Sequence, residues 1–322
     1  MLAKLIVSTF VFAAALTACS DDKGSGPDGC TGHLCGGSAA ITDPEGGNML
    51  FEYIYFDTKL QAALGVPATV NRVMAYFENA MTPNANPLPT PGQCNNLATT
   101  KGWPTYAGSS NTALDVGTFT ITGKNKAGAD VTITVPNKGK GTDQIGRAHD
   151  IFYQVVNPVA DNFLLPNSSY TVSFGGAGSI QPTTFKDGIF LADHYDVMSP
   201  PLEGAPPLVT GSDYTVHWTP VVSSNLPAGD EVLGATWLLD ANAVPTHLCP
   251  TTIDKGQFTI TKAVIDEFKA VATSRGAPTN KAVLLRNAIV HKIARLPNGD
   301  ASNKRRIDML SVFCWAQLVD VQ

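Results

Sequence analysis

The sequence contains the octapeptide DVGTFTIT at residues 115–122 and a close copy of it, DKGQFTIT, at residues 254–261, with six of the eight letters unchanged. An Asp followed two residues later by Gly is typical of a tight turn, because Asp accepts backbone hydrogen bonds and Gly adopts a positive φ. The alternation of Phe, Thr, Ile and Thr then places both apolar side chains on one face of a strand. The octapeptide pairs no nucleophile with a base. We therefore interpret it as a turn leading into a core strand.

Similar strand patterns flank both copies. Residues 70–77 (VNRVMAYF) precede the first copy and residues 212–218 (SDYTVHW) precede the second, while residues 168–174 (SSYTVSF) and 308–314 (DMLSVFC) follow them. The second copy begins 139 positions after the first. A recurrence of three strand-like segments in one order predicts a duplicated domain.

The rest of the pattern predicts an all-β protein. Short alternating segments are separated by Gly, Pro and Asn, which favours antiparallel sheets packed as sandwiches. A single helix is expected at residues 261–276, where apolar residues recur at helical spacing. The prediction is two tandem, duplicated immunoglobulin-like β-sandwich domains, residues 49–203 and 204–322, with one short helix in the second and a Pro-rich linker at residues 199–211. Further strands are expected at residues 51–56, 130–135, 231–239, 282–293 and 307–319.

The N-terminus has the pattern of an export signal. Lys4 precedes an apolar run at residues 5–16, which is too short to span a membrane and typical of a secretory signal peptide. The following LTAC, ending at Cys19, resembles a bacterial lipobox, which implies removal of residues 1–18 and lipid addition to Cys19. Residues 19–48 are rich in Gly, Ser and Asp and are interpreted as a flexible tether.

These features predict a partner and a location. The membrane is the expected partner, through the lipid on Cys19. Ser20 favours the outer membrane, whereas Asp21 and Asp22 leave retention in the inner membrane open. A formal net charge of -5 with only 15% charged residues argues against a nucleic-acid partner, because phosphate binding needs a concentrated basic face.

Five cysteines remain if Cys19 carries lipid. In an oxidising compartment disulfides are the expected state. Cys30 and Cys35 are placed to close a small loop in the tether, and a bridge between Cys249 and Cys314 is expected in the folded part. Cys94 is then left over, which either weakens this pairing or marks a buried free thiol.

Two segments carry residues that metals prefer. His149 lies beside Asp150, and His194 lies between Asp193 and Asp196. Convergence of His149, His194 and Asp196 would form a zinc-type site, although their spacing matches no helical two-histidine motif and loop polar residues are the plainer reading. The expectation is a chain without a cofactor. Zinc at these residues is one alternative, and calcium bound by the nearby acidic loop residues Asp143, Asp150 and Asp161 is the other.

Exposed aromatic rings are the other candidate for binding. Trp103 and Tyr106 lie in the segment KGWPTY, where the flanking Gly and Pro favour display at the surface. They are the predicted ligand-facing aromatics, and an envelope protein or a polysaccharide is the predicted partner class.

The lipobox, the Gly-rich tether, the segment Gly-any-Phe-Thr-Ile after a cysteine and the segment YTVHWTP together resemble a set of uncharacterised myxobacterial, deltaproteobacterial envelope lipoproteins with β-sandwich domains. The resemblance covers most of the chain after Met49. It implies a fold and a location and transfers no catalytic residue.

The functional expectation is a lipid-anchored envelope protein with a non-catalytic binding or structural role. The sequence contains no Gly-any-Ser-any-Gly nucleophile elbow, and no cysteine has a plausible base close to it in sequence. Neither of these two signatures of an enzyme is therefore present. The alternative is a metal-dependent hydrolase of the envelope that uses the loops of His149 and His194.

Overall fold

The computed structural model describes residues 45–81, 92–97, 113–142, 148–156, 165–191, 198–218, 231–251, 256–296 and 305–322. Over these ranges the chain is mainly β, with two helices, α2 (Thr58–Leu64) and α3 (Lys262–Ser274). The all-β prediction is confirmed. Neither of the helices in the described ranges has the length and apolar character needed to cross a membrane.

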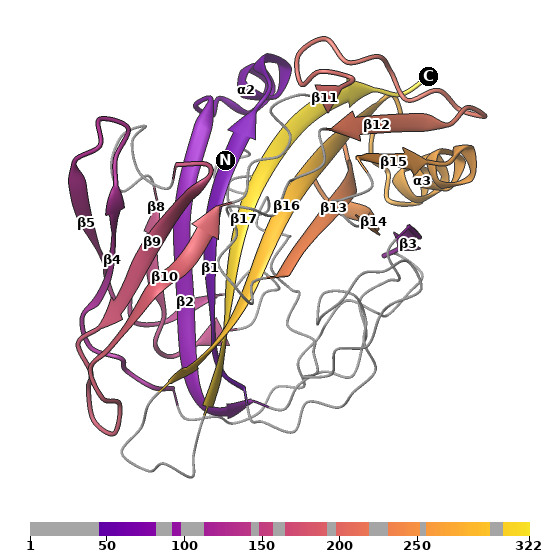
Figure 1. Ribbon diagram of the computed structural model, residues 1–322. Coiled ribbons are helices and arrows are strands. Elements are labelled where there is room, and N and C mark those ends of the chain that lie inside the picture. Colours follow the sequence, from indigo (N-terminus) through magenta and orange to yellow (C-terminus); the bar gives the residue numbers. More distant parts are fainter. Residues whose placement is uncertain are drawn as a thin grey trace.

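An eight-stranded sheet forms the centre of the molecule (Figure 1). Its strand order is β3-β14-β13-β16-β17-β1-β2-β8. The strands near its middle are long and carry runs of consecutive buried residues, as in residues 282–290 and 309–314, because both faces of the sheet are covered there. The strands are β1 (Glu45–Phe56), β2 (Thr69–Met81), β3 (Asn95–Asn96), β8 (Tyr153–Val156), β13 (Glu231–Asp240), β14 (Pro245–Thr251), β16 (Lys281–Leu296) and β17 (Arg305–Asp320).

The first and the last long strands of the described chain lie side by side in this sheet. β1 pairs in parallel with β17, from Glu45 opposite Arg306 to Phe56 opposite Ala316. The sheet therefore takes β1, β2, β3 and β8 from the N-terminal side of residue 203 and β13, β14, β16 and β17 from residues 204–322. The predicted boundary at 203/204 does not separate two sheets, because the backbone edges of β1 and β17 satisfy each other's hydrogen bonds.

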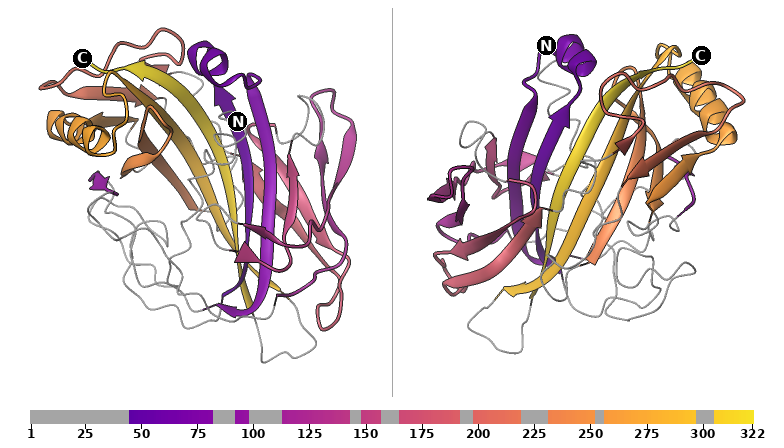
Figure 2. Two further views of the ribbon diagram at one scale, coloured as in Figure 1. Left: turned by 180° about the vertical axis from the view of Figure 1, so that it is seen from behind. Right: turned by 45° about the horizontal axis from the view of Figure 1, so that its top comes forward.

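Two smaller sheets pack against the central one (Figure 2). The order of the four-stranded sheet is β10-β9-β4-β5, and that of the three-stranded sheet is β11-β12-β15. A two-stranded ribbon joins β6 to β7. The additional strands are β4 (Phe119–Lys124), β5 (Asp130–Val135), β6 (Gly141–Thr142), β7 (Ala148–His149), β9 (Ser168–Phe174), β10 (Thr183–Leu191), β11 (Met198–Ser199), β12 (Tyr214–Trp218) and β15 (Gln257–Ile260).

Both smaller sheets cover the same face of the central sheet. In β17, Met309 packs in the core under the four-stranded sheet, and Phe313 packs in the core under the three-stranded sheet and α3. The two residues are an even number of positions apart, so their side chains point to one face. Leu310 and Val312 belong to a third core on the opposite face. The arrangement is thus two sandwich-like layers that share one large sheet.

The first copy of the octapeptide forms the predicted turn and strand, and the described part of the second copy, residues 256–261, contains the predicted strand. Gly117 and Gly256 have φ values of 73° and 66°. Phe119 in β4 and Phe258 in β15 are buried. The segments that precede the two copies occupy different places in the fold. β2 lies in the central sheet, whereas its counterpart β12 pairs directly with β15.

The Pro-rich stretch at residues 199–211, predicted as a linker, is part of the fold. The buried Arg286 donates to the Pro200 carbonyl at 3.2 Å, and Gln317 donates to the Leu202 carbonyl at 2.5 Å. Leu208 is fully buried and pairs with the C-terminal residues next to β17. Side chains from the sheet therefore satisfy carbonyl groups of a segment that forms no helix or named strand after Ser199.

The predicted helix is confirmed as α3. Ile265 and Phe268 lie on its buried face, where they contribute to the core beside β13 and β14. Thr261 occupies the position before the first turn but makes no capping hydrogen bond with its side chain. Asp213 accepts from the backbone N–H of Lys262 at 2.7 Å instead, so the cap comes from the residue just before β12.

Candidate functional site

The predicted metal ligand His149 lies at the end of β7 with its ring buried. Its Nδ1 lies 2.7 Å from Oε1 of Glu78, at the end of β2. The ring stacks on Tyr76, with 3.9 Å between ring centroids and an interplanar angle of 14°. A second aromatic ring, Phe152, lies nearly parallel at 6.1 Å. These contacts give the imidazole a structural role in the packing between β2 and β7.

The other two members of the predicted metal set, His194 and Asp196, lie outside the described residues. Within the described ranges no three His, Cys, Asp or Glu side chains are grouped closely enough to hold a metal ion. The zinc site therefore stays a prediction. The same holds for the calcium alternative, because Asp143 and Asp161 also lie outside the described ranges.

The predicted pairing of Cys249 with Cys314 is wrong. Cys94 and Cys249 form a disulfide, and Cys314 is the free, buried cysteine of the described residues. β14 and β17 are three strand steps apart, which is about 14 Å, whereas a disulfide needs about 4.4–6.8 Å between Cα atoms. Cys249 also faces the core under α3, while Cys314 faces the opposite side of the sheet.

Cys314 is buried in the centre of the sheet. Burial raises the pKa of its thiol well above the usual value, and the nearby Glu52 carboxylate adds to this shift. A thiol of this kind stays protonated and is unreactive. The candidates Cys19, Cys30 and Cys35 lie outside the described residues, and so do the aromatic candidates Trp103 and Tyr106.

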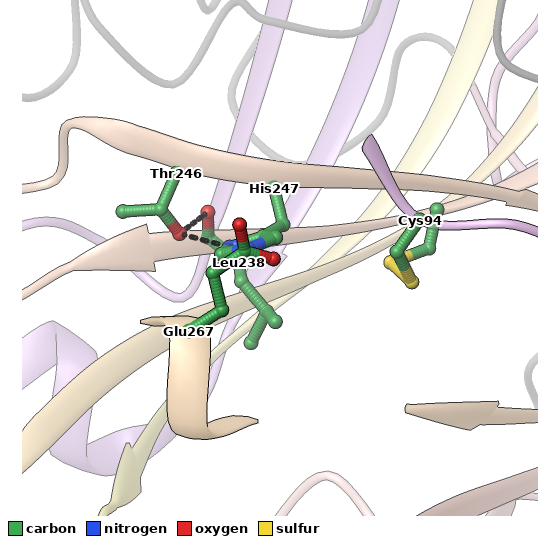
Figure 3. Close-up of a disulfide and its surroundings, with 6 residues drawn as sticks. Cys94, Leu238, Thr246, His247 and Glu267 are labelled. Atoms are coloured by element: carbon green, nitrogen blue, oxygen red, sulfur yellow. Dashed lines mark hydrogen bonds and ion pairs between the residues drawn. A yellow bond between two sulfur atoms is a disulfide. The ribbon is translucent and has the colours of Figure 1, made fainter. Parts of the chain in front are cut away.

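A polar cluster that the sequence did not reveal lies to one side of the disulfide (Figure 3). His247 in β14 points its Nε2 at Oε2 of Glu267 in α3, at 3.3 Å, and its Nδ1 lies 3.1 Å from the hydroxyl of Thr246. Thr246 in turn donates to the Leu238 carbonyl at 2.9 Å. Asn96 in β3 donates to Oε1 of Glu267 at 2.5 Å. One carboxylate therefore connects β3, β14 and α3.

The protonation states of this cluster follow from its burial. The His247 side chain is fully buried, and desolvation lowers the pKa of its imidazole. The hydrogen bond from Asn96 lowers the pKa of the Glu267 carboxyl. Both nitrogens of the His247 ring have polar partners, and these contacts hold the ring in place. We assign the cluster to the attachment of β3.

A second feature is the outer face of the four-stranded sheet. Thr120 in β4 lies opposite Thr134 in β5 and opposite Ser173 in β9, and Ser173 lies opposite Thr184 in β10. Seven hydroxyl side chains form two rows across the sheet, and together they are named the hydroxyl face: Thr134, Thr120, Ser173 and Thr184 in one row, and Thr132, Thr122 and Thr171 in the other.

The hydroxyl face is accessible to solvent. Its seven residues are half-buried or exposed, while the residues that alternate with them, such as Ile121 and Val172, are buried against the central sheet. Two hydroxyl pairs are hydrogen bonded across strands, Thr122 with Thr132 at 2.8 Å and Ser173 with Thr184 at 3.0 Å. The alternating segments TIT at 120–122, TIT at 132–134 and TVS at 171–173 already indicated hydroxyl residues on one face of each strand. The sequence did not indicate that these strands pair with one another.

Comparison with known proteins gives little further guidance. No family model matches the chain, and no curated protein matches it. A solved structure of the pilus backbone RrgB from Streptococcus pneumoniae aligns with 12% sequence identity over 78% of this chain and 50% of that one, with a TM-score of 0.15. The chain thus matches about half the length of that protein, and a TM-score this low supports no argument about fold or function.

Proposed function

We propose that the protein is a lipid-anchored component of the bacterial cell envelope with a non-catalytic structural or binding role. The observation that carries the proposal is the disulfide between Cys94 and Cys249. Structural disulfides persist in oxidising compartments outside the cytoplasm. The signal-like N-terminus supports export to such a compartment, and the LTAC segment supports attachment through Cys19.

The use of the polar side chains supports a non-catalytic role. His149 is stacked on Tyr76 and bound to Glu78, and His247 is bound to Glu267 and Thr246. In both cases the imidazole stabilises contacts between strands or between a strand and a helix. The buried Tyr153 hydroxyl likewise donates to Asp115 at 2.5 Å, inside a turn.

The alternative of a metal-dependent hydrolase using His149 and His194 receives no specific support from this geometry. The first of these rings has an aromatic and carboxylate environment suited to packing, and the second lies outside the described residues. It remains a prediction from the sequence and is not developed as a second function.

The experiment that tests the anchor is metabolic labelling with a radioactive or alkyne-tagged fatty acid in a bacterial host. We expect label on the wild-type chain, recovery in the membrane fraction and release by detergent. Cys19→Ser should carry no label, while Cys30→Ser is the matched control and should be labelled like the wild type. Equal labelling of Cys19→Ser and the wild type, or none on either, would contradict the anchor.

A second measurement tests the compartment. Free thiols are alkylated in the denatured chain before and after reduction, and the modified cysteines are located by mass spectrometry. Cys94 and Cys249 should react only after reduction in protein isolated from the envelope. Reaction of both cysteines before reduction would contradict an oxidising location.

A further inference from the structure

We propose that the hydroxyl face binds a neutral polysaccharide through regularly spaced hydrogen bonds. The inference rests on the proposed function for the location of the protein in the cell envelope. A protein anchored there is exposed to the polysaccharides of its own cell surface and of neighbouring surfaces. The two proposals can fail separately, since binding to a polymer requires no lipid on Cys19.

The first argument is the regularity of the face. Strands in a sheet are about 4.8 Å apart, and residues on one face recur about every 6.7 Å along a strand. The registers of β5, β4, β9 and β10 place the hydroxyl side chains at these two spacings. A polymer with repeated hydroxyl groups can therefore meet several side chains at once, whereas a small ligand would meet one or two.

The second argument is the absence of charge within the two rows. Each of the seven side chains is Thr or Ser, although exposed sheet faces ordinarily carry charged residues that keep them soluble and unpaired. Lys124 and Asp130, two of the charged residues next to the rows, neutralise each other in an ion pair of 2.7 Å at the end of the face. Lys186 lies two residues beyond Thr184 in β10.

The chemistry of the hydroxyl group selects the partner. Each hydroxyl donates one hydrogen bond and accepts others, as a sugar hydroxyl does. An anionic polymer would instead require Arg or Lys within the rows. A protein partner would be expected to use aromatic, Met or Arg side chains at the centre of the contact, and Ser and Thr are under-represented among residues that dominate such interfaces.

The preference of Thr for strands explains each residue by itself, and cross-strand Thr pairs also stabilise a sheet. That explanation predicts a face that binds nothing. A binding face predicts many weak contacts in register, so measurable retention requires several copies of the protein on one polymer, as lipid anchoring or micelles provide. The two explanations therefore differ in a measurable way.

The test is cosedimentation of the full chain, held in detergent micelles, with insoluble crystalline cellulose, chitin and cross-linked dextran, and with heparin beads as the anionic polymer. We expect retention on at least one neutral polymer, at low salt and in 1 M NaCl alike, because the contacts are not ionic. Retention on heparin alone, or retention that high salt abolishes, would overturn the proposal, as would no retention on any of the neutral polymers.

The variant Thr120→Val/Thr122→Val removes one hydroxyl from each row and keeps the β-branched shape. The matched control is Thr215→Val/Thr259→Val, which removes a hydrogen-bonded hydroxyl pair of 2.9 Å from the three-stranded sheet. The first variant should lose about tenfold or more in apparent affinity, and the control should retain binding. Equal binding by both variants would overturn the proposal.

Circular dichroism and thermal melting establish whether each variant folds. If the double variant does not fold, Thr132→Lys gives an independent test, because this exposed side chain lies on the edge strand β5 and the longer residue blocks close approach. Loss of retention by folded Thr132→Lys would support the proposal, and full retention would contradict it.

Discussion

Glu52 and Arg72 face each other across β1 and β2 and form an ion pair of 2.6 Å, with only 2% and 4% of their side chains exposed. Burial raises the pKa of the Glu52 carboxyl and lowers that of the Arg72 guanidinium, because both charged forms lose their water, and their mutual attraction opposes both shifts. In the strand order of the central sheet, β17 and β8 flank the two strands that carry the pair.

We expect Glu52→Gln to lower the free energy of unfolding by about 3–5 kcal/mol, since it leaves a buried guanidinium without its charged partner. The double variant Glu52→Leu/Arg72→Leu should lose less, because it removes both desolvated charges together. Urea unfolding followed by circular dichroism measures both. A double variant less stable than Glu52→Gln would contradict this expectation. It would show that the attraction within the ion pair exceeds the desolvation cost of its two charges.

The disulfide should stabilise the fold strongly, because it links residues 155 positions apart. Loop-closure entropy predicts a loss of about 5 kcal/mol for Cys94→Ser, an upper value since denatured chains retain structure. Urea unfolding of Cys94→Ser and of the reduced wild type should give the same lowered midpoint. The control Cys314→Ser retains the disulfide and should respond to reduction as the wild type does; an unchanged midpoint after reduction would contradict the assigned role.

His247 makes the stability depend on pH. Its folded-state pKa lies below the unfolded value, so above that unfolded value, about 6.5, the imidazole is neutral in both states and its full contribution is present. As the pH falls below this value the unfolded chain takes up the proton first, and stability is lost. Glu267, whose folded-state pKa is also lowered, loses its contribution only below about 4.5.

The measurement is the thermal midpoint of the wild type and of His247→Gln between pH 8 and pH 5. We expect the midpoint of the wild type to fall more steeply with decreasing pH than that of the variant, and the difference between the two slopes isolates His247 from the other histidines. Parallel curves would show that the ring is not desolvated in the folded protein.

Gly117 and Gly128 offer a matched comparison of backbone requirements. Both have positive φ, 73° and 79°, but a Cβ at Gly117 would lie 2.5 Å from the Gly176 carbonyl oxygen, whereas a Cβ at Gly128 would meet nothing within 4 Å. Gly128→Ala should cost about 1–2 kcal/mol for the left-handed conformation alone. Gly117→Ala should cost clearly more, measured by urea unfolding, and equal losses would show that the close approach relaxes without penalty.

Local patterns were enough to predict most of the elements. The alternation in residues 130–135 and 168–174 predicted β5 and β9 with the observed bounds, and the apolar spacing around Phe268 predicted α3. The Asp-any-Gly segment predicted the turn at Gly117, since few other residues adopt its dihedral. These features depend on neighbours within a few residues, so they are present in the sequence as periodicity and turn chemistry.

The sequence by itself thus determined most of the longer strands, the longer helix and the Gly turn at Gly117, whereas β10, β14 and the short helix α2 were not predicted. Only the tertiary structure decided that β1 pairs with β17, that Cys94 rather than Cys314 joins Cys249, and that hydroxyl residues of four strands form two rows. The physical reason is that a strand's alternation sets which side chains share a face but not which edge it meets. The partner and the register follow from long-range closure of the chain and from the packing of three cores against one sheet.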